Sequence, residues 1–321
     1  MSRIVVLDGY AENPGDLSWE AVAGQGTFTV YDRTAPEEVA ARIGDAEIVL
    51  TNKTPLTAEV FQSCPSIRYV GVLATGYNIV DVTAATACGV TVTNIPSYGT
   101  AAVAQFTFAL LLELCHQAGR HSDTVHGGRW SASPDFCYWD FPQVLLEGQT
   151  LGIVGYGRIG QAVARLALAF GMQVLAYSPQ HAACPGSSLR PAGLEEIFAQ
   201  SDVISLHCPL TPETAGLINT RSIAQMKDGV FLVNTARGGL IVEEDLRAGL
   251  LSGKVGGAAL DVLAEEPPRQ GSPLFNAPNC IITPHIAWAA KAARSRLMEI
   301  AAENLTAWRQ GHPQNVVSGP R

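Results

Sequence analysis

The sequence Gly155-Tyr-Gly-Arg-Ile-Gly160 constrains the fold of this chain more than any other segment. It follows an apolar run at 151–154 that is typical of a buried strand, and it precedes a helical pattern at 161–170. In such a turn the first glycine allows a tight bend, the second allows a ligand to approach the backbone, and the third allows helix and strand to pack closely. The pattern therefore predicts a βαβ unit that holds the phosphates of a dinucleotide at a helix N-terminus.

Short apolar runs alternate with helical patterns from one end of the chain to the other. This alternation predicts an α/β protein with parallel sheets and helices on both faces, and 321 residues suffice for two such domains. We expect two doubly wound, Rossmann-like domains. The predicted strands are 4–7, 27–31, 47–51, 69–72 and 90–93 in the first domain, and 150–154, 173–177, 203–206, 230–233, 257–260 and 280–283 in the second. Predicted helices of the first domain include 36–43, 57–62 and 80–87.

The last helical pattern, at 289–308, has no place in the second sheet. We expect it to cross back to the first domain, which makes that domain discontinuous. The predicted substrate-binding (catalytic) domain is 1–99 plus 288–321, and the predicted dinucleotide-binding domain is 100–287. Hinges are expected near 98–100 and 285–290.

Charge and cysteine content exclude several classes of protein. The net charge is −8 and no basic block occurs, which argues against nucleic acid or an anionic membrane surface as the partner. The seven cysteines are odd in number and include no C-x-x-C, which favours reduced thiols, a cytoplasmic protein and no metal site. His207 and Cys208 form a conceivable metal pair, but a buried strand end is the favoured interpretation. No signal-peptide pattern precedes the first strand.

Two segments indicate a partner subunit. Residues 101–114 form an almost wholly apolar helical pattern, and a helix that is apolar on every face must be buried on every face. Residues 131–142 form an aromatic-rich arm that includes Phe136 and Trp139. We predict a homodimer formed through the 101–114 helix and the 131–142 arm. The alternative is that the arm packs on its own domain.

The choice between NAD(H) and NADP(H) depends on the end of the strand after the glycine turn. An acidic residue there would bind the ribose 2′-hydroxyl of NAD, but this chain has Ser178. No arginine follows at once, although Arg158, Ser178, Gln180 and His181 together offer groups for a 2′-phosphate. Either cofactor is allowed, with a slight preference for NADP(H). The cofactor-binding residues predicted are Gly155, Gly157, Arg158, Ile159, Gly160, Ser178, His207, Cys208, Pro209, Thr235, Ala236 and Asp261.

Three separated residues downstream of the turn supply a set of groups suited to reducing a 2-keto acid. Arg237 can bind a carboxylate through its planar guanidinium. His285 can exchange a proton with a carbonyl oxygen near neutral pH. A glutamate, Glu266 or its neighbour Glu265, can hold the other ring nitrogen of the histidine.

Four motifs occur in the order found in one enzyme family. The glycine turn, Asn234-Thr-Ala-Arg-Gly238, Asp261-Val-Leu-Ala-Glu-Glu-Pro267 and Thr283-Pro-His-Ile-Ala287 resemble those of the D-isomer-specific 2-hydroxyacid dehydrogenases. The resemblance covers essentially the whole chain. Segments such as Leu50-Thr-Asn-Lys-Thr-Pro-Leu56 and Gly71-Val-Leu-Ala-Thr-Gly-Tyr-Asn78 are most similar to the glycerate dehydrogenase (hydroxypyruvate reductase) branch.

This resemblance implies an active site in the cleft between the domains. It places the histidine-binding role on the glutamate before Pro267, which is Glu266, and it makes Arg237, Glu266 and His285 the catalytic residues. The loop Leu73, Ala74, Thr75 and Gly76 is then expected to cradle the substrate carboxylate through its backbone. Lys53 is expected to add positive potential, and Trp288 to wall the pocket, unless Lys53 is simply solvated.

The predicted activity is reversible reduction of hydroxypyruvate and glyoxylate to the D-2-hydroxy acids with NAD(P)H. One alternative is a dehydrogenase of D-lactate or of a bulkier 2-keto acid. The formate dehydrogenases resemble this family but lack a glutamate partner for the histidine, so Glu266 argues against them. A third hypothesis is a dinucleotide-sensing corepressor. It is disfavoured because such proteins carry flexible tails, and this sequence ends soon after its last expected helix.

Overall fold

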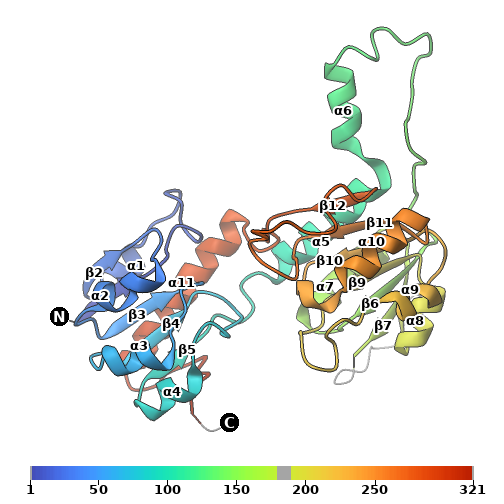
Figure 1. Ribbon diagram of the computed structural model, residues 1–321. Helices are drawn as coiled ribbons and strands as arrows, with labels where there is room; N and C mark the ends of the chain where they lie inside the picture. The colour runs from blue at the N-terminus through green and yellow to red at the C-terminus, as the bar shows by residue number, and fades with distance from the viewer. Residues whose placement is uncertain (1, 179–188, 320–321) are drawn as a thin grey trace. The chain divides into compact units, whose positions relative to one another are not determined.

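A computed structural model describes residues 2–178 and 189–319 of the chain. The chain forms two compact units, Met1–Gly99 with Ala289–Arg321, and Thr100–Trp288. Each unit is a parallel sheet covered by helices (Figure 1).

The first unit contains a five-stranded sheet in the order β2-β1-β3-β4-β5, with every pair parallel. Its strands are β1 (Arg3–Val6), β2 (Thr27–Val30), β3 (Ile48–Thr51), β4 (Tyr69–Val72) and β5 (Thr91–Thr93). Its helices are α1 (Glu20–Ala23), the 3₁₀ turn η1 (Pro36–Glu38), α2 (Val39–Ile43), α3 (Ala58–Ser63), α4 (Val82–Ala87) and α11 (Lys291–Arg309).

The helices of the first unit cover both faces of its sheet. Apolar residues of α2, α3 and α4 join one buried cluster with β1, β3, β4 and β5, whereas α11 packs against α1 and β4. The central strands β3 and β4 are buried along their whole length. Burial on both faces explains why they appear in the sequence as continuous apolar runs instead of alternating ones.

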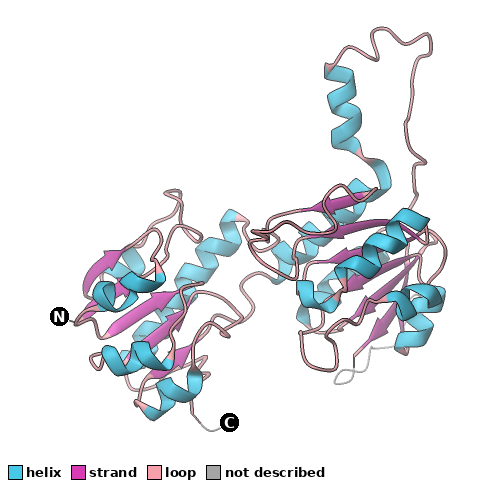
Figure 2. Ribbon diagram, in the orientation of Figure 1, coloured by secondary structure: helices cyan, strands magenta, loops and turns pink. Residues whose placement is uncertain are grey.

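The second unit contains a seven-stranded parallel sheet in the order β12-β11-β10-β9-β6-β7-β8. Its strands are β6 (Thr150–Val154), β7 (Gln173–Tyr177), β8 (Leu189–Pro191), β9 (Val203–Leu206), β10 (Val230–Asn234), β11 (Val255–Leu260) and β12 (Cys280–Ile282). Its helices are α5 (Thr100–His116), α6 (Ala118–His126), α7 (Arg158–Ala169), α8 (Leu194–Gln200), α9 (Thr220–Gln225), the 3₁₀ turn η2 (Gly238–Leu240) and α10 (Glu243–Ser252). Helices α5 and α7 cover one face, and α8, α9 and α10 cover the other (Figure 2).

The eleven strands expected from the sequence are all present, and their bounds differ by at most two residues. The short edge strand β8 was not expected, because three residues that include Pro191 carry little strand signal. The helix expected at 36–43 begins instead as a 3₁₀ turn and becomes α-helical at Val39.

Within the single chain, the helix at residues 101–114 is buried on one side only, and its burial in a dimer interface stays a prediction. One side of α5 packs against α7, β10 and β11. Ala101, Gln105 and Ala109, which are spaced four residues apart and share one side of the helix, are exposed. One narrow side of this mostly apolar helix is therefore exposed within the chain.

Helix α6 and the segment after it extend away from the sheet of the second unit (Figure 1). The side chains of Phe136 and Trp139 on this arm are 88% and 66% exposed. Arg129 lies over the ring of Tyr138, at 4.2 Å from its centre, so part of the arm packs on itself.

Within 2–178 and 189–319, no single helix is long and apolar enough to cross a membrane. Helices α5 and α6 reach that length and composition only together, across a 57° bend.

Candidate active site

The topology of the second sheet brings the three predicted catalytic residues to one edge. Arg237 follows β10, Glu266 follows β11 and His285 follows β12. These strands are neighbours and are all parallel, so their carboxyl ends meet at the same edge. Ligands of open α/β sheets bind at this edge.

His285 and Glu266 form a direct pair. The Nδ1 atom of His285 lies 2.6 Å from Oε2 of Glu266, and Oε1 of Glu266 accepts a hydrogen bond from the N–H of Leu263 at 3.0 Å. Since a carboxylate can only accept, Nδ1 carries the proton of this bond. The pair thus orients the ring and leaves Nε2 as the atom that can exchange a proton with another molecule.

The backbone at His285 adopts an uncommon conformation that Asp261 supports. His285 has φ of +55°, in the left-handed region that non-glycine residues rarely adopt. Its N–H donates to the carbonyl of Asp261 at 2.8 Å, and the buried Asp261 carboxylate accepts from the N–H groups of Ile286 and Ala287 at 2.8 Å each. Trp288 Nε1 donates to the His285 carbonyl at 2.8 Å. The loop is therefore held on both sides of the histidine.

Asp261 and Trp288, predicted to contact the cofactor and the substrate, also hold the loop around His285. The carboxylate of Asp261, which also accepts from Thr283 Oγ1 at 2.6 Å, is 1% exposed and holds the histidine loop. The indole N–H of Trp288 is likewise bonded within the loop. Both residues thus have a structural task beside the ligand contacts expected of them.

Arg237 lies on a turn that Asn234 braces. The Asn234 side chain is fully buried, donates to the Arg237 carbonyl at 2.9 Å and accepts from the N–H of Ala236 at 3.0 Å. The Arg237 side chain is exposed, with Nη1 donating to the Ala236 carbonyl. The motif Asn-Thr-Ala-Arg is thus a self-bonded turn that presents the guanidinium at the sheet edge.

Gly238 allows two loops of the site to touch. A Cβ atom at this position would lie 1.9 Å from the carbonyl carbon of Leu263 and 2.4 Å from the nitrogen of Ala264. Only glycine permits that approach. The arginine turn therefore packs directly on the segment that leads to Glu266.

The glycine turn has the geometry of a phosphate-binding cradle. Gly155 has φ of +104° and packs on the backbone of His207 and Cys208, and a Cβ at Gly160 would lie 2.2 Å from the Gly155 carbonyl oxygen. A Cβ at Gly157, the N-cap of α7, would instead meet nothing within 4 Å. Gly155 and Gly160 thus allow backbone segments of the fold to pack closely, whereas Gly157 faces open space.

The start of α7 supplies the donors that such a cradle needs. The N–H groups of Gly157, Arg158 and Ile159 donate to no residue among those the structure describes. The helix N-terminus adds a partial positive charge in the same place. These features fit the pyrophosphate of a dinucleotide.

The remaining predicted cofactor residues follow other strands of the same sheet. Ser178 directly follows β7, His207, Cys208 and Pro209 follow β9, and Thr235 and Ala236 follow β10. The His207 side chain is partly buried, with Nε2 at 2.8 Å from Ser205 Oγ, and burial lowers the pKa of the ring to about 4. His207 and Cys208 thus lie at the end of a strand, as expected. Gln180 and His181 lie outside the described residues.

The loop Leu73–Gly76, which we call the substrate loop (73–76), follows β4 in the first unit. The Leu73 N–H donates to the Thr51 carbonyl at 2.8 Å, so it is used within the fold. Ala74, Thr75 and Gly76 have backbone N–H groups that donate to no acceptor in the described part of the chain. Successive free N–H groups form a concave anion site. Lys53, after β3 in the same unit, is exposed.

Sequence reasoning missed the residues that hold these loops in place. Asp8, directly after the β1 segment, accepts hydrogen bonds from the N–H groups of Asn52, Lys53 and Thr54 at 2.8, 2.6 and 2.7 Å. An acidic residue at the end of an apolar strand is a usable signal for such a role. Asn234 and Gly238, by contrast, were visible only as parts of a motif.

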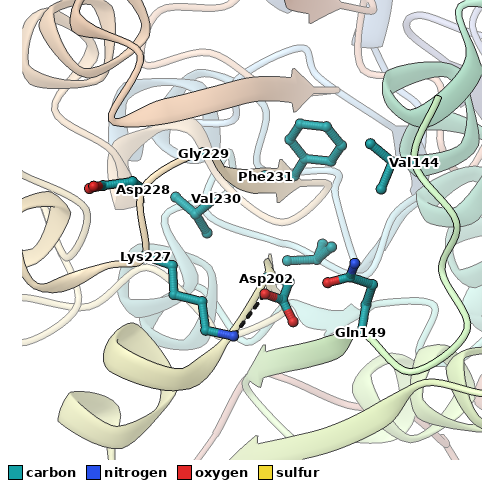
Figure 3. A pocket seen from close by; sticks show the side chains of 9 residues that line it. Val144, Gln149, Asp202, Lys227, Asp228, Gly229, Val230 and Phe231 are labelled. Atoms are coloured by element: carbon teal, nitrogen blue, oxygen red, sulfur yellow. Dashed lines mark hydrogen bonds and ion pairs between the residues drawn. The ribbon is translucent and has the colours of Figure 1, made fainter. Parts of the chain in front are cut away.

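A separate pocket of about 220 Å³ lies in the second unit (Figure 3). It is lined by Gln149, Asp202, Lys227 and Phe231, among others, and Lys227 Nζ bonds Asp202 Oδ1 at 2.7 Å. These residues stand at the amino ends of β6, β9 and β10. The pocket is thus at the opposite edge of the sheet from the glycine turn, and it is no part of the candidate active site.

The chain is similar to known proteins over most of its length. The family model for the NAD-binding domain of D-isomer specific 2-hydroxyacid dehydrogenases matches residues 108–287. A hydroxypyruvate reductase of Blautia hydrogenotrophica is 56% identical over 98% of this chain and 99% of its own length. A glycerate dehydrogenase of Methylorubrum extorquens is 42% identical over 90% of this chain and 91% of its own.

A solved structure is similar over almost the whole chain as well. An acyclic imino acid reductase in complex with NADPH and D-arginine has a TM-score of 0.84 and 28% sequence identity. The match covers 98% of this chain and 99% of that one. The fold is thus shared with a protein whose structure was solved in complex with NADPH.

Proposed function

Because the chain belongs to the D-isomer specific 2-hydroxyacid dehydrogenase family, we propose that it reversibly reduces hydroxypyruvate, and also glyoxylate, to the D-2-hydroxy acid with NAD(P)H. The choice of hydroxypyruvate is supported by the 56% identity to a hydroxypyruvate reductase over nearly the full length of both chains. The single structural observation that carries the chemistry is the 2.6 Å contact between His285 and Glu266 at the carboxyl edge of the second sheet.

In this proposal His285 is the general acid of keto-acid reduction and the general base of the reverse reaction. Its Nε2 atom gives a proton to the carbonyl oxygen of the substrate and takes it back on oxidation. Glu266 stabilises the imidazolium and fixes the protonated nitrogen, Nδ1. The exposure of the His285 side chain, 31%, leaves the ring accessible to a small substrate.

Arg237 is proposed to bind the carboxylate of the substrate and to polarise the carbonyl at C2. A guanidinium can donate two parallel hydrogen bonds to a carboxylate, which fixes the orientation as well as the position of the substrate. The substrate loop (73–76) is proposed to bind the same carboxylate through its free N–H groups, with Lys53 adding positive potential and Trp288 limiting the size of the substrate.

We propose that the predicted domain 100–287 binds the dinucleotide and that the predicted domain 1–99 with 288–321 binds the substrate. Gly157 and the first residues of α7 hold the pyrophosphate, with further contacts from the residues after β9 and β10. The bound dinucleotide supplies the hydride. Ser178 places no carboxylate at the end of β7 to repel a 2′-phosphate, which supports a slight preference for NADP(H).

We also propose a homodimer formed through α5 and the arm. The exposed Ala101 and Ala109 of α5 and the exposed rings of Phe136 and Trp139 support it, since uncovered apolar surface marks interaction sites. Light scattering should give twice the chain mass, and the double variant Phe136→Ser, Trp139→Ser should shift towards the monomer.

A cytoplasmic location is proposed because the described cysteines are all free.

The proposed activity is tested by following the absorbance of the reduced nicotinamide with hydroxypyruvate, glyoxylate and pyruvate, each with NADH and NADPH. We expect the highest kcat/KM with hydroxypyruvate, and the coenzyme ratio then measures what Ser178 does. Preference for pyruvate would favour the D-lactate alternative. Tight dinucleotide binding without turnover of any of the acids would contradict the proposal and favour a sensing role.

A further inference from the structure

The first unit buries a carboxyl group that the proposed function does not use. Glu12, in the segment after β1, is fully buried. Its Oε2 atom has no hydrogen-bond partner among the residues that the structure describes. Burying a carboxyl with one unsatisfied oxygen is costly, and an apolar side chain would fill the space without that cost. The residue therefore requires an explanation.

Glu12 is linked to the substrate loop through one intermediate side chain. Its Oε1 atom accepts a hydrogen bond from Nδ2 of Asn52, which is 4% exposed. The same Nδ2 atom donates to the carbonyl oxygen of Leu73 at 2.9 Å. Leu73 is the first residue of the loop whose next three N–H groups are free. The three residues follow the adjacent strands β1, β3 and β4, so the chain of bonds crosses the carboxyl edge of the sheet.

The link leaves Asn52 little freedom. Its backbone N–H is bonded to Asp8 Oδ1 at 2.8 Å, and both acceptors of its side-chain amide group are buried. On the other side, Arg294 Nη1 donates to the Glu12 carbonyl at 2.9 Å, while Arg294 is paired with Asp16 through two bonds of 2.8 Å. Helix α11 thus anchors the backbone of Glu12.

Burial and the nearby Asp8 carboxylate favour the neutral form of Glu12. Three charged residues face Glu12: Asp8 after β1, Lys53 after β3, and Arg294 on α11. The ion pair with Asp16 offsets the charge of Arg294. Burial first, and then the Asp8 carboxylate, raise the pKa of Glu12 to about 8, although Lys53 acts in the opposite direction. At neutral pH the raised pKa therefore keeps most of the Glu12 carboxyl protonated.

We propose that Glu12 is a positioning residue of the substrate loop, which it orients by fixing the Asn52 amide against the first carbonyl of the loop. The inference rests on the proposed function, because it takes this loop to bind the substrate carboxylate. A neutral Glu12 holds the cradle without repelling the anion. An ionised Glu12 places a negative charge close behind the cradle and weakens binding of the anion.

The test compares the full-length wild type with Glu12→Gln and Glu12→Ala, and uses Glu20→Ala, which removes an exposed carboxylate of the same unit, as the control. Glutamine keeps the acceptor for Asn52 and cannot ionise. For each protein KM and kcat for hydroxypyruvate are measured from about pH 6 to about pH 9.5 at saturating coenzyme. Titration of oxamate, an unreactive 2-keto acid analogue, into the enzyme–NADH complex gives the anion affinity without turnover.

At about pH 7 we expect Glu12→Ala to raise KM about tenfold with kcat within about twofold, and Glu12→Gln to restore the wild-type KM. Above about pH 8 the wild-type KM should rise more steeply than that of Glu12→Gln, because only glutamate ionises. Parallel KM profiles of wild type and Glu12→Gln would overturn the proposal, as would a Glu12→Ala variant that unfolds more easily at unchanged KM.

The same data separate this inference from the proposed function. A wild type that turns over no keto acid refutes the proposed activity. The oxamate titration still compares the anion affinity of the substrate loop (73–76) in wild type and variants. Conversely, normal turnover with equal oxamate affinity in wild type and Glu12→Ala refutes the role of Glu12 and leaves the activity in place. Because NADH binding reports on the other unit, thermal unfolding of every variant checks that the first unit, which contains Glu12, is folded.

Discussion

The backbone N–H of His285 donates to the carbonyl oxygen of Asp261 at 2.8 Å, while the carboxylate of Asp261 accepts from the next two N–H groups of the same loop. One buried acid at the end of β11 thus determines where the histidine after β12 lies. The left-handed backbone of His285, with φ of +55°, depends on these bonds, since that conformation is unfavourable by itself.

Replacing Asp261 with asparagine should therefore disturb the histidine loop. The amide NH₂ of asparagine would face N–H groups, and leaving buried donors unpaired costs about 1–3 kcal/mol. We expect a lower melting temperature and a lower kcat. Thr283→Val, which removes one of the bonds to the carboxylate, should have a smaller effect of the same kind. A rise in the KM for coenzyme alone would instead assign Asp261 to the cofactor.

Glu266→Gln should reduce kcat by about 10²–10⁴-fold, because a neutral amide does not stabilise the imidazolium. The affinity for NADH, measured by fluorescence, should change little. Glu265→Gln is the matched control, since the neighbouring glutamate is exposed and the two substitutions are chemically identical. His285→Ala should cause a loss of similar size to Glu266→Gln. Equal losses in both glutamate variants would contradict the assigned pair.

Gly238→Ala should destabilise the second unit and lower activity. The added Cβ would meet the Leu263 backbone at 1.9 Å, and backbone atoms cannot move aside as a flexible side chain can. Gly193→Ala is the control, because a Cβ there meets nothing within 4 Å and its φ of −75° suits any residue. Thermal unfolding of both variants decides the matter; a normal melting temperature for Gly238→Ala would refute the close contact between the two loops.

The outer and middle glycines of the dinucleotide turn should respond differently to alanine. Gly160→Ala brings a Cβ to 2.2 Å from the Gly155 carbonyl oxygen and should lower the melting temperature. Gly157→Ala has open space and should fold normally, yet weaken NADH and NADPH binding, because the methyl group occupies the place of the phosphates. Calorimetric titration of the coenzymes measures this difference. Unchanged affinity in Gly157→Ala would argue against the proposed cradle.

Acid should destabilise the protein through His207. Burial lowers the pKa of this ring to about 4 from the ordinary value of 6.5, so between these values the unfolded chain binds a proton that the folded chain does not. The contribution of His207 is thus fully present above pH 6.5 and falls with decreasing pH, by at most about 1.4 kcal/mol per pH unit.

Denaturant unfolding of the coenzyme-free protein at several pH values checks this expectation. His207→Gln should lose less stability between pH 6.5 and 4 than the wild type. The exposed His312→Gln variant should follow the wild type. If all three proteins lose stability in parallel, burial does not lower the pKa of His207.

The alternation of apolar runs and helical patterns was sufficient to predict both parallel sheets. A strand that is buried on both faces needs a continuous apolar run, and a crossover helix needs a 3.6-residue pattern, so both are visible locally. Edge strand β8 lacked that signal. The sequence also did not indicate which side of α5 is exposed within the chain, because the exposed alanines of this helix are as apolar as its buried ones.

The sequence by itself determined the chemical groups of the site and their order: the glycine turn, Arg237, Glu266 and His285 are recognisable from their immediate neighbours. Only the tertiary structure decided how they are held. The support of His285 by Asp261, the contact that Gly238 permits and the link from Glu12 to Leu73 join residues on different strands, and such contacts arise only when parallel strands align their carboxyl ends. Local pattern records which residue is present, whereas packing determines what each residue touches.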